Sequence, residues 1–238
     1  MDRSKKRRSI KYKILSCSIY NTRWIKFNNI TNPNQITFNN ITVVKKEGII
    51  YNLNNLTILN TDFTNITGRI INNTGKLKLE NTNIKDIYAD GIYIEINTAT
   101  KNYNKTYGKH PEGMIVYNTN ELILKNTSIT GLYYDAYWSR ITKLQTKNGP
   151  IYNSGNCSIE NSYFENSGVN YEELGTDAKQ ILRGGAIANY GTLTIKNTTI
   201  IKTESEYGGA IYNEGNATID NITSRLSTAF TQGYSIYN

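Results

Sequence analysis

Histidine, cysteine and proline are scarce in this chain of 238 residues, and the scarcity excludes several classes of protein. The single histidine, His110, has no second histidine or nearby cysteine with which to form a zinc site or a nucleophilic triad. Two cysteines, Cys17 and Cys157, are too few for a disulfide framework or a metal cluster. Phosphate-binding loops and dinucleotide fingerprints are also missing. We therefore expect no cofactor, and we interpret Cys157 as a small core residue.

Long apolar runs and an evenly spread charge are missing too. No segment approaches the ~18 apolar residues of a membrane-spanning helix, and the apolar run after the basic start is too short for a signal peptide. The net charge of +8 lies entirely in residues 1–26, which hold nine basic residues and one acid. We predict a basic, non-repeat tail there, solvated or touching anionic lipid, wall polymer or nucleic acid. The balanced remainder is not typical of a nucleic-acid-binding body.

What the chain does contain is an internal repeat over residues 27–238. An asparagine serves as the origin of each copy: Asn32, Asn52, Asn73, Asn118, Asn153, Asn189 and Asn213. An Ile or Val stands two residues before each origin. Two residues after it stands only Asn or Gly: Asn34, Asn54, Gly75, Asn120, Gly155, Gly191 and Gly215. These two residue types enter left-handed backbone most easily, so this slot predicts a left-handed corner.

Apolar residues fill slots +4 and +6 of every copy, with a polar residue between them in six of the seven, which predicts a short strand with one buried face. Slot +11 is apolar in six of the seven copies. Slot +8 is always asparagine: Asn40, Asn60, Asn81, Asn126, Asn161, Asn197 and Asn221. Since slot +8 shares the parity of +4 and +6, we predict that these side chains point inward and hydrogen-bond to one another from copy to copy.

The spacing of the repeat predicts a coil of stacked strands. Successive origins are 20, 21, 45, 35, 36 and 24 residues apart. We predict an all-β, single-stranded, right-handed parallel β-helix of about 8–10 rungs. The longer gaps predict insertions near residues 86–112, 132–148 and 167–183. Residues 233–238 repeat the opening of a further rung, so we expect a fragment whose partners include further rungs of a longer parent chain.

A family resemblance arises from the tetrapeptide Gly-Gly-Ala-Ile, which begins at Gly184 and again at Gly208. Together with aromatic-plus-Asn strands such as residues 163–166, it resembles the repeats of polymorphic outer-membrane adhesins. The Asn- and Thr-rich background is most similar to the adhesin-like surface proteins of methanogenic archaea. The resemblance implies a right-handed parallel β-helix of the pectin lyase-like kind, export, and an adhesive, non-enzymatic role at the cell surface. Its ligand would be a surface glycan or a protein.

Carbohydrate cleavage is the alternative function. The stretch 86–95 contains Asp86, Asp90 and Glu95, and its Asp-Gly-Ile piece resembles a fragment of pectin-degrading β-helices. Glycoside hydrolysis needs two carboxyl groups about 5–9.5 Å apart. Two or more of these acids on one lateral groove, beside Arg or Lys, would favour a polysaccharide lyase or hydrolase. A structural role in turns is the other interpretation.

One predicted insertion is rich in aromatic residues next to polar ones. It contains Tyr133, Tyr134, Asp135, Tyr137, Trp138 and Arg140. Exposed aromatic rings beside polar groups are typical of carbohydrate- and protein-binding surfaces. The other interpretation is that these rings fold back and cover the side of the coil. This insertion is the binding surface that the sequence predicts.

Overall fold

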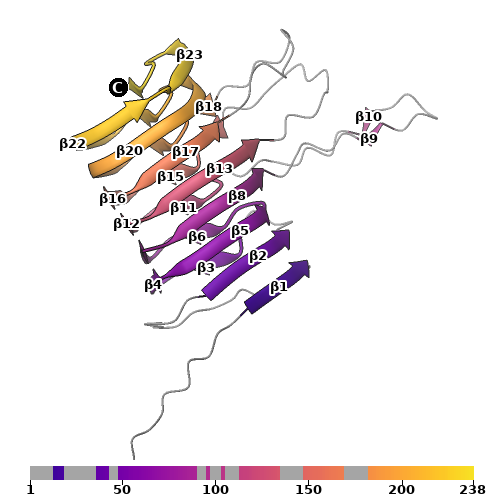
Figure 1. Ribbon diagram of the computed structural model, residues 1–238. Coiled ribbons are helices and arrows are strands. Elements are labelled where there is room, and N and C mark those ends of the chain that lie inside the picture. The colour runs from indigo at the N-terminus through magenta and orange to yellow at the C-terminus, as the bar shows by residue number, and fades with distance from the viewer. Residues whose placement is uncertain are drawn as a thin grey trace, which may run out of the picture.

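The structure is a parallel β-helix, as the repeat predicts (Figure 1). The computed structural model describes residues 13–18, 36–42, 48–89, 95–96, 103–104, 113–134, 147–168 and 182–238. These residues form strands and turns and no helix. Accordingly, none of them belongs to a helix with the length and hydrophobicity needed to cross a membrane. Each turn of the coil contributes three short strands, which stack on the matching strands of the turns before and after.

The strand that carries the origin asparagine forms the first wall of the coil. This wall is a seven-stranded parallel sheet made of β3 (Ile50–Asn52), β6 (Ile71–Asn73), β11 (Val116–Asn118), β15 (Ile151–Asn153), β19 (Ile187–Asn189), β21 (Ile211–Asn213) and β24 (Ile236–Tyr237). Its register places each origin asparagine opposite the next, as in the pairing of Asn118 with Asn153. Equal slots of successive copies of the repeat therefore pair with each other in the stacked strands.

The other two strands of each turn form the second and third walls, which belong to one larger sheet. The second wall contains β4 (Asn55–Leu59), β7 (Lys76–Glu80), β12 (Glu121–Lys125) and β16 (Asn156–Glu160). The third contains β1 (Lys13–Ser18), β2 (Ile36–Thr42), β5 (Thr61–Thr67), β8 (Asn83–Ala89), β13 (Ser128–Tyr134), β17 (Tyr163–Gly168) and β23 (Thr228–Gln232). The long strands β20 (Thr192–Tyr207) and β22 (Asn216–Arg225) run through both walls.

Short paired strands accompany the main walls. They are β9 (Glu95–Ile96) and β10 (Tyr103–Asn104), which pair antiparallel, and β14 (Lys147–Asn148) and β18 (Leu182–Arg183), which pair in parallel. Both pairs lie within or beside the segments that the sequence predicts as insertions. Through Arg183, β18 also joins β20 opposite Tyr207. The return from the third insertion is thereby fixed to the coil.

The left-handed corners of the coil lie at slots +8 and +13. In the last six copies of the repeat, the asparagine at slot +8 has a φ near +50°: Asn60, Asn81, Asn126, Asn161, Asn197 and Asn221. Slot +13 holds Asn65, Asp86, Gly131, Asn166, Lys202 and Leu226, also at positive φ. The left-handed corner predicted at slot +2 is therefore wrong in its conformation, since no described residue there has a positive φ. The chain does bend at that slot.

Glycine at slot +2 has a steric reason instead. A Cβ added to Gly191 would lie 2.1 Å from the carbonyl oxygen of Gly155, in the rung before. A Cβ added to Gly215 would lie 2.0 Å from the carbonyl oxygen of Gly191. Neighbouring turns thus approach backbone to backbone at this bend, which favours the residue without a side chain.

A buried ladder of asparagine side chains lies under the first wall, at the origins of the repeat. The Nδ2 of each origin donates to the Oδ1 of the next over 2.5–2.7 Å, and this inner ladder comprises Asn52, Asn73, Asn118, Asn153, Asn189, Asn213 and Asn238. Each amide also bonds backbone carbonyl groups, as Asn153 does with Gly155 and Thr192 at 3.0 and 3.1 Å. The backbone carbonyl groups at the corner next to the first wall therefore have hydrogen-bond donors from the protein itself.

The asparagines at slot +8 form a second, outer ladder. They hydrogen-bond from rung to rung in two runs, from Asn126 through Asn81 to Asn60 at 3.1 and 3.2 Å, and from Asn221 to Asn197 at 2.8 Å. Their side chains are exposed, however, so the predicted inward orientation is wrong. The left-handed φ interrupts the strand alternation at this slot, and Thr127 or its counterpart at slot +9 is buried instead.

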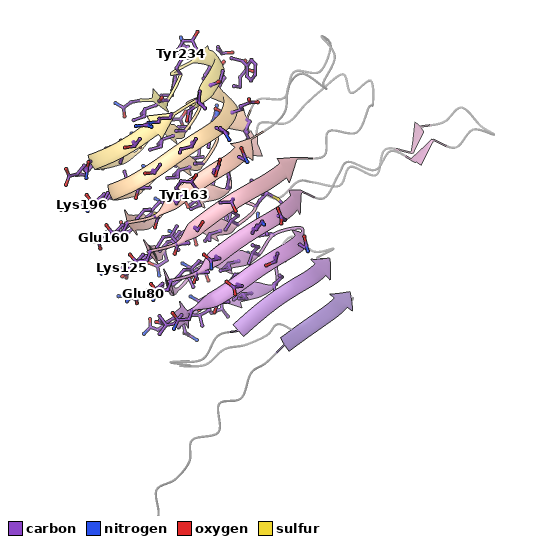
Figure 2. The ribbon with its side chains drawn as sticks, in the orientation of Figure 1. Glu80, Lys125, Glu160, Tyr163, Lys196 and Tyr234 are labelled. Atoms are coloured by element: carbon purple, nitrogen blue, oxygen red, sulfur yellow. The ribbon has the colours of Figure 1, made fainter. Side chains whose placement is uncertain are left out.

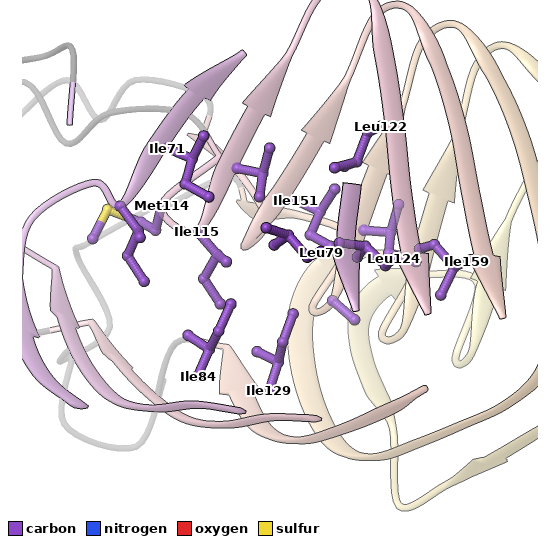
Figure 3. Packing of buried hydrophobic residues seen from close by; sticks show 14 of the residues in the cluster. Ile71, Leu79, Ile84, Met114, Ile115, Leu122, Leu124, Ile129, Ile151 and Ile159 are labelled. Carbon is purple, nitrogen blue, oxygen red and sulfur yellow. The ribbon is translucent and has the colours of Figure 1, made fainter. Parts of the chain in front are cut away.

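The core is the column of apolar side chains enclosed by the three walls (Figure 3). The predicted slots −2, +4, +6 and +11 supply it together with slots −3 and +14, as Ile70 and Ile87 show. The two largest fully buried side chains are Phe63 and Phe164, both at slot +11. Each turn adds a layer of Ile, Leu or Phe on the layer before, such as Ile84 and Ile129. A single rung cannot enclose these groups, so burial depends on the stack.

The start of the coil differs from the sequence frame. The register pairs Phe38 with Phe63, and Asn39 and Ile41 with residues 64 and 66, so Asn40 lies opposite Asn65 at slot +13 rather than in line with Asn60. The predicted origin Asn32 and its neighbour Asn34 lie outside the described residues. β1, within the predicted non-repeat tail, pairs in parallel with β2 and extends the third wall.

We expect the Cys157 thiol to be unreactive in the folded protein. Cys157 fills slot +4 of β16, and burial raises the pKa of its thiol to about 12. Because the thiolate is the reactive form, a Cys17→Ser variant should react with a thiol reagent at pH 8 on the order of a hundredfold more slowly in buffer than in urea. Stopped-flow absorbance gives both rates, and equal rates would contradict the burial.

Candidate binding surface

Tyrosine side chains form a continuous column on the outer face of the first wall. Slot −1 points outward between the buried slots −2 and 0. The column comprises Tyr117, Tyr152, Tyr190, Tyr212 and Tyr237, whose successive ring centroids are 4.6, 5.4, 5.8 and 5.0 Å apart. Tyr117 stacks on Tyr152 at 3°, and Tyr212 on Tyr237 at 5°. All except Tyr212 are partly exposed.

The column is continuous because one rung supplies its ring from a different slot. In β19, slot −1 holds the small, buried Ala188, which pairs with Tyr152 on one side and Tyr212 on the other. Tyr190, two residues further along, lies between the rings of those two tyrosines. Five successive turns therefore each present one tyrosine ring.

A polar cluster is built on the column around Arg183. Its guanidinium carbon lies 4.9 Å from the Tyr212 ring centroid, and its Nη1 donates to the Tyr190 hydroxyl at 3.0 Å. Glu214 completes the arginine cluster, with its Oε1 3.9 Å from the same Nη1, and it also accepts the Tyr212 hydroxyl. The Nε of Arg183 is buried and has no hydrogen-bond acceptor among the described residues.

The electrostatics of the arginine cluster keep Arg183 charged and Tyr212 neutral. Burial, followed by the hydrogen bond to Glu214, raises the pKa of Tyr212 well above its ordinary value. Burial opposes the charge of Arg183, but the hydrogen bond to Tyr190 and the charge of Glu214 offset it, so the pKa of Arg183 is raised. Arg183 is therefore a cation, and Tyr212 a hydroxyl donor, throughout the physiological pH range.

A second cation lies at the N-terminal end of the column. The guanidinium carbon of Arg69 is 4.8 Å from the Tyr117 ring centroid, and Arg69 is itself buried. Cation–π contacts of this kind hold the guanidinium against the ring. The outer face of the first wall thus combines aromatic edges, hydroxyl groups and two guanidinium groups along the axis of the coil.

The third wall carries a cluster of the same residue types as the arginine cluster, but this cluster is not part of the tyrosine column. Tyr163 donates to Glu165 at 2.7 Å, and the Nζ of Lys202 lies 3.1 Å from the same carboxylate. The hydrogen bond to Glu165 raises the pKa of Tyr163 and, in return, lowers the pKa of Glu165. Tyrosine, carboxylate and cation occur here as around Arg183, but on the third wall, where Figure 2 labels Tyr163.

The predicted acid cluster is not assembled by the described residues. Asp86 occupies the left-handed corner at slot +13, with a φ of +54°, and its carboxylate lies 3.8 Å from the Nζ of Lys85. Asp90 lies outside the described residues. Glu95 is in β9, where the structure describes the backbone alone. In the described part of the chain, no three His, Cys, Asp or Glu side chains are grouped as metal ligands would be.

The predicted aromatic insertion is described only at its start. Tyr133 and Tyr134 end β13, where they pair with Gly168 and with Tyr88 and Ala89. Asp135, Tyr137, Trp138 and Arg140 lie outside the described residues, so the predicted binding patch remains a prediction. The tyrosine column was not predicted, although tyrosine recurs at slot −1 in Tyr51, Tyr117, Tyr152, Tyr212 and Tyr237.

The fold and this surface define a class of protein: a parallel β-helix with two asparagine ladders and a lateral tyrosine column. Comparison with known proteins finds no matching family model, no matching curated protein and no matching solved structure. Conclusions about function therefore depend on the chemistry of the surface.

Proposed function

We propose that this chain is a non-enzymatic, adhesin-like binding protein that holds a linear glycan along the tyrosine column. The observation that carries the proposal is the column itself: five rings and the Arg183 cluster on an outer face that the core does not use. Aromatic rings pack against the C–H faces of sugars, while hydroxyl, guanidinium and carboxylate groups hydrogen-bond to sugar hydroxyl groups.

The repeat geometry suits a polymer more than a compact ligand. Rings recur once per turn and four of the five are partly exposed, so a chain laid along the axis meets an accessible ring at most steps. Much of each ring face is covered by its neighbours, as in the parallel pair Tyr117 and Tyr152, so binding uses ring edges and hydroxyl groups. Such contacts are weak singly and gain strength by repetition along one rigid surface.

Display at the cell surface is the second part of the proposal. It rests on the Gly-Gly-Ala-Ile repeats at Gly184 and Gly208 and on their resemblance to surface adhesins. If the proposal is right, protease added to intact cells removes the protein, and an antibody against it labels unbroken cells. Protection from protease until the cells are lysed would contradict surface display.

The binding test is a glycan array followed by titration of the best polysaccharide. We expect Arg183→Gln and Tyr152→Ala to weaken binding at least about tenfold, equivalent to about 1.4 kcal/mol. Tyr163→Ala, which removes a tyrosine bonded to a carboxylate on the third wall, is the matched control and should bind like wild type.

Two outcomes would overturn the glycan proposal. The first is equal loss of affinity in the Tyr163→Ala control, which would place binding elsewhere. The second is the absence of any glycan binding while a protein ligand binds in a way that depends on Arg183, which would assign the surface to protein recognition. Circular dichroism of every variant verifies that the coil is intact.

A further inference from the structure

The outer face of the second wall carries an acceptor sequence for N-linked glycans. Asn156, Cys157 and Ser158 form the tripeptide Asn-x-Ser, in which the middle residue can be any residue except proline. Asn156 opens β16 directly after the bend at residues 154 and 155. Acceptor asparagines of N-linked glycans lie on protein surfaces, where the bulky, hydrophilic substituent meets solvent. The start of β16 is such a position.

Strand alternation divides the three residues of this tripeptide between core and solvent. Cys157 fills slot +4 and is buried, so Asn156 at slot +3 and Ser158 at slot +5 both point outward and are exposed. β16 lies between β12 and β20 in the wall (Figure 1). The exposure of Asn156 is therefore a property of the complete wall and does not depend on either end of the coil.

The neighbours of Asn156 leave room for a substituent. In the register of the wall, Glu121 and Thr192 lie on either side of it. Glu121 forms an ion pair at 3.0 Å with Lys76 of β7, on its side away from Asn156, and Thr192 is short and exposed. None of the described residues hydrogen-bonds the carboxamide of Asn156. A sugar on its Nδ2 therefore displaces no bond among them.

Other acceptor tripeptides of the coil are engaged in its structure. Asn126, in Asn-Thr-Ser at slot +8, has a φ of +49°, and its Nδ2 donates to the Oδ1 of Asn81 at 3.1 Å. Asn72, in Asn-Asn-Thr on the first wall, has a buried Oδ1. A sugar on either of these two amides would have to displace contacts of the folded coil, whereas a sugar on Asn156 would not.

We infer that Asn156 carries an N-linked glycan, transferred from a donor in which the sugar is linked to a lipid phosphate, and that Asn126 does not. In the transfer, the Nδ2 of Asn156 forms a bond to the anomeric carbon of the first sugar and loses a proton to a base of the transferase. The bond from that carbon to the phosphate oxygen breaks, and the lipid phosphate leaves with the electron pair. The inference rests on the proposed surface display, since N-linked glycans are acquired by exported proteins.

Mass spectrometry of tryptic peptides tests the inference on protein isolated from the cells that produce it. Peptide 148–179 contains Asn156 as its one acceptor asparagine, and peptide 126–140 contains Asn126 as its one. We expect the first peptide to carry a sugar mass and the second to be unmodified. Ser158→Ala, which keeps Asn156 but removes the hydroxyl group, should abolish the modification, and Ser158→Thr should retain it.

An unmodified Asn156 peptide overturns the inference, and protease treatment of intact cells then distinguishes it from surface display. If the protease removes the protein from intact cells, display stands and only the N-linked glycan is wrong. If the protein is protected until lysis, both are wrong. A mass on Asn156 that persists in Ser158→Ala also overturns the inference, because the modification is then independent of the acceptor tripeptide. Equal modification of Asn126 would overturn the selection of Asn156 by the folded coil.

Discussion

Replacing Asn153 with alanine is expected to lower the free energy of unfolding by about 3–5 kcal/mol, because it interrupts the inner ladder at its centre. The Asn153 amide donates to Asn189, Gly155 and Thr192 over 2.7–3.1 Å, and its Oδ1 accepts from Asn118 at 2.7 Å. The Oδ1 also accepts from the backbone N–H of Gly155 at 3.3 Å, so five partner groups lose a bond when the side chain is removed. Thermal unfolding followed by circular dichroism should show a Tm roughly 10 °C lower.

The matched control is Asn156→Ala, three residues further along the chain. Asn156 is exposed on β16, so its replacement should change the stability by no more than about 0.5 kcal/mol. Equal losses in the two variants would contradict a special role for the inner ladder. Urea titration alongside the thermal scan shows whether the whole stack still unfolds in one step.

Asn153→Asp adds a test by pH. The introduced carboxyl group would face carbonyl oxygens and be buried, so its pKa in the folded state is raised above the value of about 3.9 in the unfolded chain. Stability is then highest below the unfolded pKa and falls as the pH rises toward the folded pKa. The measurement is the free energy of unfolding of the variant minus that of wild type at the same pH. We expect this difference to be less unfavourable at pH 4 than at pH 7.

The fold was predictable because each turn places the same types of residue in the same structural positions. Apolar residues at slots −2, +4, +6 and +11 recur in one frame, and their burial in layers confirms the prediction of stacked strands. Asparagine ladders between rungs are confirmed too. Periodic features of this kind can be read from the chain because a repeat places equal slots in equal surroundings.

The orientation of slot +8 was not predictable from alternation alone. Counting by twos from Leu122 and Leu124 places Asn126 inward, but its φ of +49° turns the chain there and leaves the side chain outside. The origin asparagine shares the parity of slot −2 and is the buried one, as Asn118 and Val116 show. A residue in the left-handed conformation changes which alternate residues point inward in the strand that follows. In the sequence, the only sign of this change is the asparagine itself.

The tyrosine column needed the structure for a different reason. Tyr190 belongs to slot +1, whereas its neighbours Tyr152 and Tyr212 belong to slot −1, so the frame alone leaves a gap at Ala188. Arg183 is six residues before its origin, in a short strand beside an insertion, where the repeat gives no register. Contacts between residues in different slots depend on the length and direction of their side chains, which the spacing of residues along the sequence does not predict.

Phe164→Ala is expected to cost about 3–5 kcal/mol, because a large fully buried side chain is replaced by a methyl group. Phe164 lies between Ile129 and Ile200 in the stack, and both layers lose contacts when the ring is removed. Urea denaturation at 25 °C measures the loss.

Phe230→Ala is the matched control for Phe164→Ala, since Phe230 is 52% exposed at the end of the coil. Its replacement should cost no more than about 1 kcal/mol, because much less surface leaves water there on folding. Because each turn contacts only its neighbours, the central substitution can also divide the unfolding transition in two, as the turns on either side of the cavity lose their coupling. A small effect of Phe164→Ala together with a large one of Phe230→Ala would contradict a core enclosed by the central rungs and would place the stabilising contacts at the end of the coil.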